Sequence, residues 1–330
     1  VMCLYAYRKR PDDGQDPMPG SDIHTTIDMN LQDVADAALE AQLRKNGAHH
    51  GCVVVMETQT GYIKAISNLT LEADSSYGED LNYAVGASTE PGSIFKTAAL
   101  MVALDDGRVS PDQIVDTRGG KRKYYDRTMT DSHDGGWGLI TLQRALEVSS
   151  NTGISQAIDA AYKSDPSRFV DGLRRLGFGS PLGVRIPGEG MPVMHGPEDK
   201  KLWSGTSLPG RSIGYEVAQT PLRMLTFYNA IANGGKMMQP QFVRNITRDG
   251  KEVERFQPVT LNPKICTDAT LGDLHKMLEG VVDSGTAMNL RSAHFRIAGK
   301  TGTAQIASDK AGYKVNGVSY QASFVGYFPA

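Results

Sequence analysis

The sequence predicts an α+β fold in which antiparallel strands from both ends of the chain pack against a mostly helical middle. Three observations predict it. A helix followed by a strand hairpin occupies residues 29–67, helices recur through residues 93–282, and two more strands fall within residues 295–328. The economical arrangement of such elements is one antiparallel sheet, built from both ends, with the helices packed against it.

The composition excludes several classes of function. The 330 residues are 40% hydrophobic and 22% charged, as in an ordinary globular protein, and the formal net charge is −2. This charge gives no electrostatic reason to expect a nucleic-acid partner. The three cysteines match no zinc or redox spacing, and no apolar run is long enough to span a membrane. We therefore expect no nucleic-acid partner, no metal and no cofactor.

The N-terminal region predicts a linker followed by a regular domain. Residues 8–22 are polar and rich in Pro, Gly and Asp, so residues 1–22 are interpreted as a linker or the remnant of another module, and residues 23–330 as one domain. Asp28 is a possible N-cap and Gly47 ends the first helix. Its apolar residues at helical spacing are Leu31, Val34, Ala38 and Leu39.

A hairpin and a series of helices follow. Residues 52–56 and 62–67 are predicted as strands joined by a turn, with Cys52 as a buried thiol. Residues 108–138 and 177–214 are expected to be irregular, and Lys121–Lys123 to be a solvated loop face. The predicted helices begin near Ser93, Thr141, Thr152, Thr220 and Leu271. The final strands cover residues 295–306 and 319–328, joined by a polar loop.

Ser93 and Lys96 form the first candidate for chemistry. A Pro-Gly turn delivers Ser93 to the first turn of an apolar helix, and residues three apart on a helix share a face, so the hydroxyl and the amine can meet. The positive end of the helix dipole also favours an alkoxide there. A Ser-x-x-Lys pair nevertheless arises roughly once by chance in a chain of this length. A capping serine and a surface lysine would explain it equally well.

Two further motifs lie far along the chain. Ser149-Ser150-Asn151 interrupts a helical region, and a simple helix break would explain it because Ser and Asn compete for backbone hydrogen bonds. Lys300-Thr301-Gly302 is more specific, with roughly 0.1 chance occurrences expected. It lies on a predicted strand whose glycines let a ligand backbone approach closely, although a bulged edge strand is the alternative.

Other types of site fit the sequence poorly. A phosphate-binding loop needs a glycine five residues before Gly299, where His294 stands, and the segment leads into a strand instead of a helix. No Gly-x-Ser-x-Gly nucleophile elbow is present. Asp131-x-His133-Asp134 could hold a metal, but its spacing matches no metal site well, and a polar loop is the better interpretation.

Taken in order, Ser-x-x-Lys, Ser-x-Asn and Lys-Thr-Gly are the signature of penicillin-binding proteins and class A β-lactamases. From His24 to Phe328 the chain resembles the transpeptidase domain of a class B penicillin-binding protein, and is more similar to division-type than to elongation-type members. The resemblance implies the penicillin-binding and serine β-lactamase-like fold, with the sheet truncated at the C-terminus of this chain. The segments that carry it are residues 26–32, 90–93, 214–222, 232–235 and 298–304.

The resemblance implies acyl transfer on peptidoglycan stem peptides that end in D-Ala-D-Ala. Ser93 would be the nucleophile and neutral Lys96 its base, since burial and a second cation, Lys300, lower a lysine pKa. Ser149 would relay a proton to the departing amine, and Asn151 would hydrogen-bond both Lys96 and a substrate amide.

The same resemblance assigns the binding groups and the setting. The Lys300, Thr301, Gly302 and Thr303 segment would hold the terminal carboxylate, and the backbone N–H groups of Ser93 and Thr303 would form the oxyanion hole. β-lactams would trap Ser93. The intact protein would work with a glycosyltransferase and other division proteins at the extracytoplasmic face of the bacterial cytoplasmic membrane, anchored by an N-terminal helix outside this chain.

Three alternatives share the fold. A class A β-lactamase hydrolyses its acyl-enzyme with a glutamate, and the usual Glu-x-x-Leu-Asn context is absent here. A D,D-carboxypeptidase would pass the acyl group to water. A non-catalytic sensor would use acylation by β-lactams as a signal.

Overall fold

The structure, a computed structural model, describes residues 20–306 and 319–330 and divides the chain into two compact units. The first unit contains the described residues 20–25 together with residues 243–257. It is a three-stranded antiparallel sheet in the order β1-β12-β13, formed by β1 (Asp22–Thr25), β12 (Val243–Arg248) and β13 (Lys251–Arg255). This small sheet was not predicted from the sequence, and the predicted boundary between residues 22 and 23 stays a prediction.

The second unit contains residues 26–242 and the described part of residues 258–330, and carries every candidate site residue. Its helices are α1 (Met29–Asn46), α2 (Tyr83–Gly86), η1 (Gly92–Phe95), α3 (Lys96–Asp105), α4 (Leu142–Glu147), α5 (Asn151–Tyr162), α6 (Pro166–Arg175), α7 (Ser207–Ser212), α8 (Pro221–Ala232), α9 (Asp268–Asp283) and η2 (Met288–Leu290). Its strands are β2 (His50–Met56), β3 (Ile63–Leu71), β4 (Tyr77–Gly78), β5 (Ile114–Asp116), β6 (Gly119–Tyr124), β7 (Arg127–Gly135), β8 (Leu139–Thr141), β9 (Val193–Met194), β10 (Val217–Ala218), β11 (Met237–Met238), β14 (Thr260–Asn262), β15 (Ala298–Ile306) and β16 (Ser319–Tyr327).

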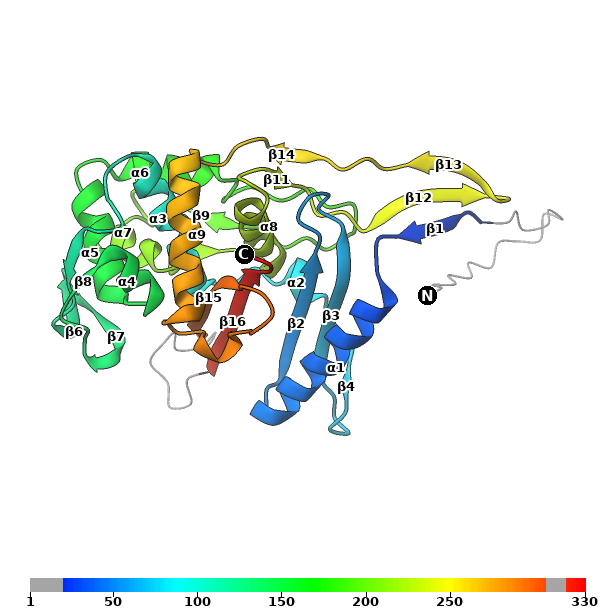
Figure 1. The fold of residues 1–330 in the computed structure, drawn as a ribbon, viewed down its shortest axis with the longest axis horizontal. Helices are drawn as coiled ribbons and strands as arrows, with labels where there is room; N and C mark the ends of the chain where they lie inside the picture. Colours follow the sequence, from blue (N-terminus) through cyan, green and yellow to red (C-terminus); the bar gives the residue numbers. More distant parts are fainter. Residues whose placement is uncertain (1–19, 307–318) are drawn as a thin grey trace. The chain divides into compact units, whose positions relative to one another are not determined.

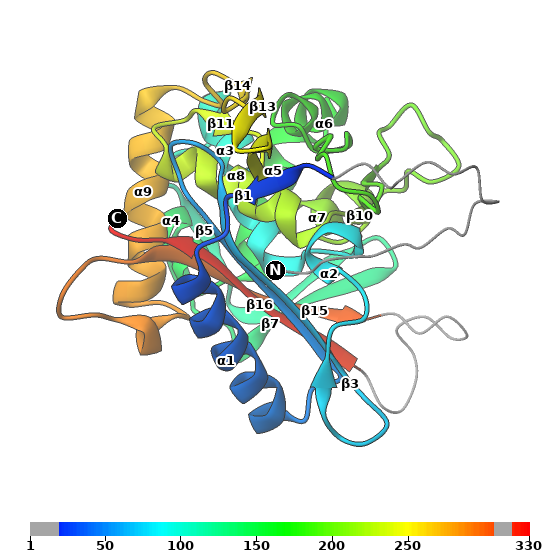
Figure 2. The ribbon, with the colours of Figure 1, turned by 90° about the vertical axis from the view of Figure 1, so that its right-hand side faces the viewer.

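Strands from both ends of the chain come together, as the sequence predicts. They form two antiparallel ladders, β2-β3-β4 from the first part of the unit and β15-β16 from the last. The ladders lie alongside each other in both views, and α8 contacts both β2 and β16 (Figures 1 and 2). The turned view shows α1 and α2 on opposite sides of the β2–β3 strands (Figure 2). The predicted α+β architecture is confirmed.

Helix α3 is the centre of the hydrophobic core. Every side chain from Lys96 to Ala103 is buried, so the helix is enclosed on all sides, as expected for a helix that is apolar around its whole circumference. Phe95, immediately before it, is fully buried and packs edge-on against Phe178. The core therefore fixes the helix whose first residues are the Ser-Lys motif.

The predicted helix boundaries are confirmed where local capping chemistry determines them. The Asp28 carboxylate accepts hydrogen bonds from the Asn30 and Leu31 amides, and Gly47 ends α1 in the left-handed conformation. The Thr220 hydroxyl caps α8, with proline at the first helical position. The predicted apolar face of α1 is wrong in part. Leu31, Val34 and Ala38 are exposed, and the buried residues are Ala35, Leu39 and Leu43.

Two segments predicted as irregular contain regular structure. Residues 108–138 include β5 and the β6–β7 hairpin, so the Lys121–Lys123 segment is a strand instead of a loop. Residues 177–214 include β9 and α7. Helix α6, which precedes this segment, was not predicted from the sequence. The β6 and β7 side chains are mostly exposed, so no hydrophobic alternation marks these strands in the sequence. Cys52 lies on β2 as predicted but is only partly buried.

None of the helices in residues 20–306 and 319–330 is both long enough and apolar enough to cross a membrane.

Candidate active site

Ser93 lies in a short 3₁₀ turn that leads directly into α3, close to the predicted helix start. Gly92 before it has φ +57°, and a Cβ there would lie 3.1 Å from the Thr303 oxygen and from the Ala304 Cβ. A Cβ on Gly302 would lie 3.0 Å from Ile94 Cγ2. These glycines let the turn approach β15 closely, so Ser93 lies between two residues that face the Lys-Thr-Gly strand.

Lys96 is completely buried and points at the Ser-Ser-Asn motif. Its Nζ donates to the backbone oxygen of Ser149 at 2.7 Å and to the Ser149 hydroxyl at 3.1 Å. Ser93 is partly exposed. Among the described residues no hydrogen bond joins its hydroxyl to Lys96, so the direct contact predicted from the i, i+3 spacing is replaced by the link from Lys96 to Ser149.

Ser149 stands at the corner between α4 and α5, which confirms the predicted helix break. Its φ of +58° is unusual for a residue with a side chain. The next residue, Ser150, is buried and caps α5 by accepting a hydrogen bond from the Gly153 amide at 2.9 Å. The corner thus turns the chain so that both oxygens of Ser149 meet the Lys96 amine.

Asn151 is placed differently from the expectation. Its Nδ2 donates to the backbone oxygen of Thr130 on β7 at 2.8 Å. No hydrogen bond joins Asn151 to Lys96 within the part of the chain that the structure describes, and the Lys96 amine is engaged by Ser149 instead. The predicted Asn151–Lys96 hydrogen bond is therefore wrong for this structure, because β7, which the sequence did not reveal, supplies the partner.

The Lys-Thr-Gly motif lies on β15, paired along its length with β16. Strand alternation buries Lys300, Gly302 and Ala304 on one face and leaves Thr303 exposed on the other. Lys300 donates to the Thr301 backbone oxygen at 2.9 Å. The Thr301 hydroxyl lies 2.6 Å from the hydroxyl of Thr286, which fixes the outer side of the strand. The predicted strand is confirmed.

Both buried lysines have lowered pKa values. Burial lowers the pKa of Lys96 well below its usual value, the charge of Lys300 lowers it further, and the carboxylate of Asp131 opposes both effects. Burial also lowers the pKa of Lys300 to about 7. A buried amine with a depressed pKa can be neutral at ordinary pH and accept a proton, which an exposed lysine cannot do.

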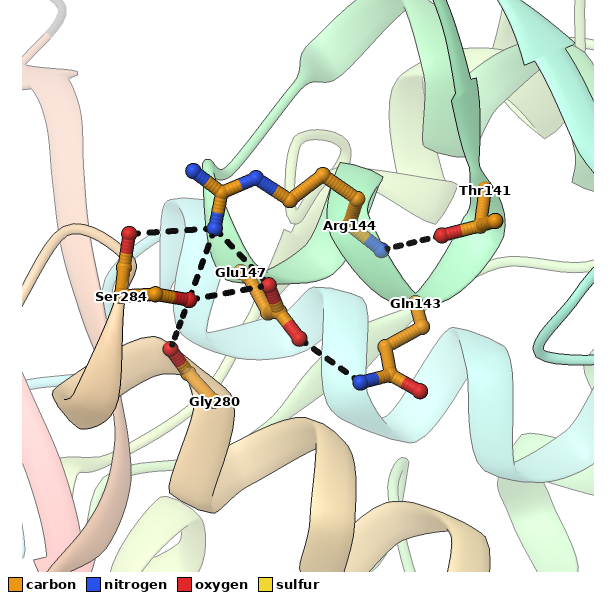
Figure 3. A network of polar contacts seen from close by, with 6 residues as sticks. All are labelled: Thr141, Gln143, Arg144, Glu147, Gly280 and Ser284. Carbon is orange, nitrogen blue, oxygen red and sulfur yellow. Dashed lines mark hydrogen bonds and ion pairs between the residues drawn. The ribbon is translucent and has the colours of Figure 1, made fainter.

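A buried carboxylate, that of Glu147, joins the end of α4 to the end of α9 (Figure 3). Glu147, two residues before Ser149, accepts hydrogen bonds from Gln143 and Arg144 at 2.8 Å each and from Ser284 at 3.3 Å. Its backbone oxygen accepts from the Thr286 amide at 3.1 Å. Since the Thr286 hydroxyl contacts Thr301, this network joins the second motif to the third.

Replacing Glu147 with alanine should therefore lower the free energy of unfolding by about 1–3 kcal/mol, because Gln143, Arg144 and Ser284 lose a buried, charged acceptor. Urea denaturation of the variant beside wild type measures the change. Glu40→Ala is the control, since its salt bridge with Arg44 is solvent-exposed on both sides and should contribute less than about 1 kcal/mol. Equal losses for the two variants would contradict this interpretation of the network.

The structure brings the buried Lys96 and Lys300 and the partly buried Ser149 together beside Ser93, while Thr301 and Thr303 lie on the outer face of β15. This arrangement offers a hydroxyl nucleophile, an amine able to take its proton and a hydroxyl able to pass the proton on. No group of three potential metal ligands occurs within residues 20–306 and 319–330. The contacts that Asp131, Glu147 and Thr286 make in the site could not be predicted from the sequence, because they include partners distant in the chain.

The chain is similar to a well-populated group of proteins. The family model described as "Penicillin binding protein transpeptidase domain" matches residues 51–330. The penicillin-binding protein PbpB of Mycolicibacterium smegmatis is 29% identical over 347 residues, which cover 100% of this chain and 51% of that protein. The probable peptidoglycan D,D-transpeptidase PbpC of Pseudomonas aeruginosa is 30% identical, over 95% of this chain and 53% of the relative.

Solved structures agree with this similarity. The apo form of penicillin-binding protein 3 from Mycobacterium tuberculosis superimposes with a TM-score of 0.80 at 27% identity, over 93% of this chain and 70% of that one. The same protein has been solved in complex with aztreonam, with the same TM-score and identity. The chain spans about half the length of the curated relatives it matches.

Proposed function

The chain belongs to the penicillin-binding protein transpeptidase family, and from this premise we propose that it is a peptidoglycan D,D-transpeptidase. One observation of the site carries the proposal. A fully buried lysine, three residues after Ser93, donates to the hydroxyl of Ser149 and is electrostatically coupled to a second buried lysine, Lys300. Such a cluster suits a serine nucleophile that must lose a proton and pass it to a leaving amine.

In the proposed acylation, Ser93 Oγ attacks the carbonyl carbon of the penultimate D-Ala of a stem peptide. Neutral Lys96 accepts the Ser93 proton as the Oγ–C bond forms. When the C–N bond breaks, the proton passes from Lys96 through the Ser149 hydroxyl, 3.1 Å away, to the nitrogen of the departing D-Ala. The amine of a neighbouring stem peptide then takes the acyl group and releases Ser93.

The remaining site residues bind and orient the substrate. Lys300, Thr301, Gly302 and Thr303 form the strand against which the terminal carboxylate is held, and the backbone N–H groups of Ser93 and Thr303 stabilise the oxyanion. Support for the oxyanion hole comes from the close packing of Gly92 on Thr303 and Ala304. Asn151, which is held by the backbone oxygen of Thr130 on β7, hydrogen-bonds the substrate amide in this proposal.

We further propose a role in cell division at the extracytoplasmic face of the bacterial membrane, with β-lactams as inhibitors and a glycosyltransferase and other division proteins as partners of the intact protein. The relatives support this proposal through their names. They include PbpB of Mycobacterium tuberculosis and a peptidoglycan D,D-transpeptidase FtsI homolog of Mesostigma viride.

The mass of the intact folded protein after exposure to benzylpenicillin tests the proposal. We expect one covalent adduct that persists for hours, because a transpeptidase excludes water from its acyl-enzyme. An adduct that turns over within seconds would instead indicate a β-lactamase. The absence of any adduct on folded protein would contradict the assignment.

A further inference from the structure

We propose that Asp131 on β7 is a positioning residue for the acyl-transfer reaction, holding the Ser149–Asn151 corner so that Ser149 stays in contact with Lys96. The inference rests on the proposed function. It concerns a residue that the sequence analysis considered as a metal ligand and interpreted as part of a polar loop. Asp131 lies in β7 and faces the start of α5.

The Asp131 carboxylate accepts three hydrogen bonds from two residues of the corner. Oδ2 accepts from the Ser150 hydroxyl and from the Thr152 hydroxyl, both at 2.9 Å, and Oδ1 accepts from the Thr152 amide at 2.8 Å. Ser150 and Thr152 are buried, so water cannot replace the carboxylate as their acceptor. Hydrogen bonds to an ionised carboxylate are stronger than hydrogen bonds to a neutral acceptor, so the three donors are held firmly in place.

The neighbouring residue of β7 holds the corner as well. The backbone oxygen of Thr130 accepts from Asn151 Nδ2 at 2.8 Å. Two adjacent residues of β7 therefore bind three consecutive residues of the corner, Ser150 to Thr152. Strand β7 therefore holds the loop that joins α4 and α5 in place.

The hydrogen bonds from β7 matter because Ser149 is held in an unfavourable backbone conformation. Its φ of +58° is unusual for a residue other than glycine, and such a conformation persists only where the surroundings impose it. Both oxygens of Ser149 accept from Lys96, so relaxation of the corner would move the relay hydroxyl away from the base. Small displacements of catalytic groups can cost about 10²-fold in rate.

The charge of Asp131 has a second effect. The charged groups that act on Lys96 are Lys300 on β15 and Asp131 on β7, and they act in opposite directions on its pKa. Removing the negative charge of Asp131 should therefore let the pKa of Lys96 fall further. A residue that only supported the fold would not move the pH at which the base loses its proton.

The test compares second-order rates of acylation by benzylpenicillin for wild type, Asp131→Ala, Asp131→Asn and the control Asp134→Asn over a range of pH. Asp134 is an exposed acid on the same strand, three residues away. We expect a loss of about 10- to 100-fold for Asp131→Ala. The acylation rate of Asp131→Asn should lie between those of wild type and Asp131→Ala, since its amide oxygen can still accept hydrogen bonds. The acid limb of its pH–rate profile should shift to lower pH. The control should match wild type.

Each outcome bears on the inference. A wild-type rate in Asp131→Ala would overturn the inference alone. Equal losses in Asp131→Ala and Asp131→Asn with an unshifted pH profile would also overturn it, because they would indicate a purely structural role. Thermal unfolding of each variant separates a folding defect from a positioning defect. Failure of wild type to be acylated would overturn the proposed function, and the inference with it.

Discussion

Ser93→Ala should abolish covalent modification by benzylpenicillin while leaving the fold intact. The alanine side chain has no oxygen to form an ester, and loss of a serine nucleophile removes on the order of 10⁶-fold of the catalysed rate. Ser93 is partly exposed, so the substitution should cost little stability. Mass spectrometry of the intact protein measures the adduct, and thermal unfolding checks the fold.

The matched control for this variant is Ser132→Ala, an exposed serine on β7. It should be acylated at the wild-type rate. An adduct that survives Ser93→Ala at wild-type stoichiometry would place the nucleophile elsewhere and refute the assignment of Ser93.

Lys96→Met should lower the acylation rate by about 10²- to 10⁴-fold, the usual contribution of a general base. Methionine fills much of the same buried volume without bringing a charge into the core. Because Lys96 is fully buried and its pKa is lowered, the unfolded chain binds its proton more tightly than the folded protein does. Stability therefore rises with pH between the folded and unfolded pKa values of this lysine, and Lys96→Met should remove that dependence.

The pH profile distinguishes Lys96 from a merely structural lysine. Acylation should increase as pH rises through the pKa of Lys96, because only the neutral amine accepts a proton. Lys300 lowers that pKa, so in Lys300→Met the acid limb should move to higher pH, opposite to the shift expected for Asp131→Asn. In wild type, an alkaline decline should begin above about pH 7, where Lys300 loses the charge that attracts a carboxylate. A rate independent of pH in this range would contradict a lysine base.

Those features of the fold that depend on local chemistry could be predicted from the sequence. The caps Asp28 and Thr220 and the stop at Gly47 act over one helical turn, so their residues alone predict the helix ends. The exposed face of α1 could not be predicted in the same way. Whether Leu31 or Ala35 is buried depends on how α1 packs against β2 and β3, which is a matter of tertiary structure.

In the site, too, local patterns could be predicted from the sequence and tertiary contacts could not. Ser93, Lys96, Ser149 and Lys300 could be named because their spacings and neighbours are local patterns, and the structure brings Lys96, Ser149 and Lys300 together beside Ser93. The partner of Asn151 could not be named, because β7 has mostly exposed side chains and no hydrophobic alternation to identify it. Asp131 was visible as a polar residue, but its role depends on contacts about 20 residues further along the chain.

Product analysis with a synthetic stem peptide ending in D-Ala-D-Ala, supplied with an excess of an acceptor amine, is the direct test of transpeptidase activity. We expect release of D-Ala, a cross-linked peptide whose yield rises with acceptor concentration, and loss of both products in Ser93→Ala. Release of D-Ala with only the hydrolysed peptide, unchanged by the acceptor, would contradict this expectation and indicate a carboxypeptidase.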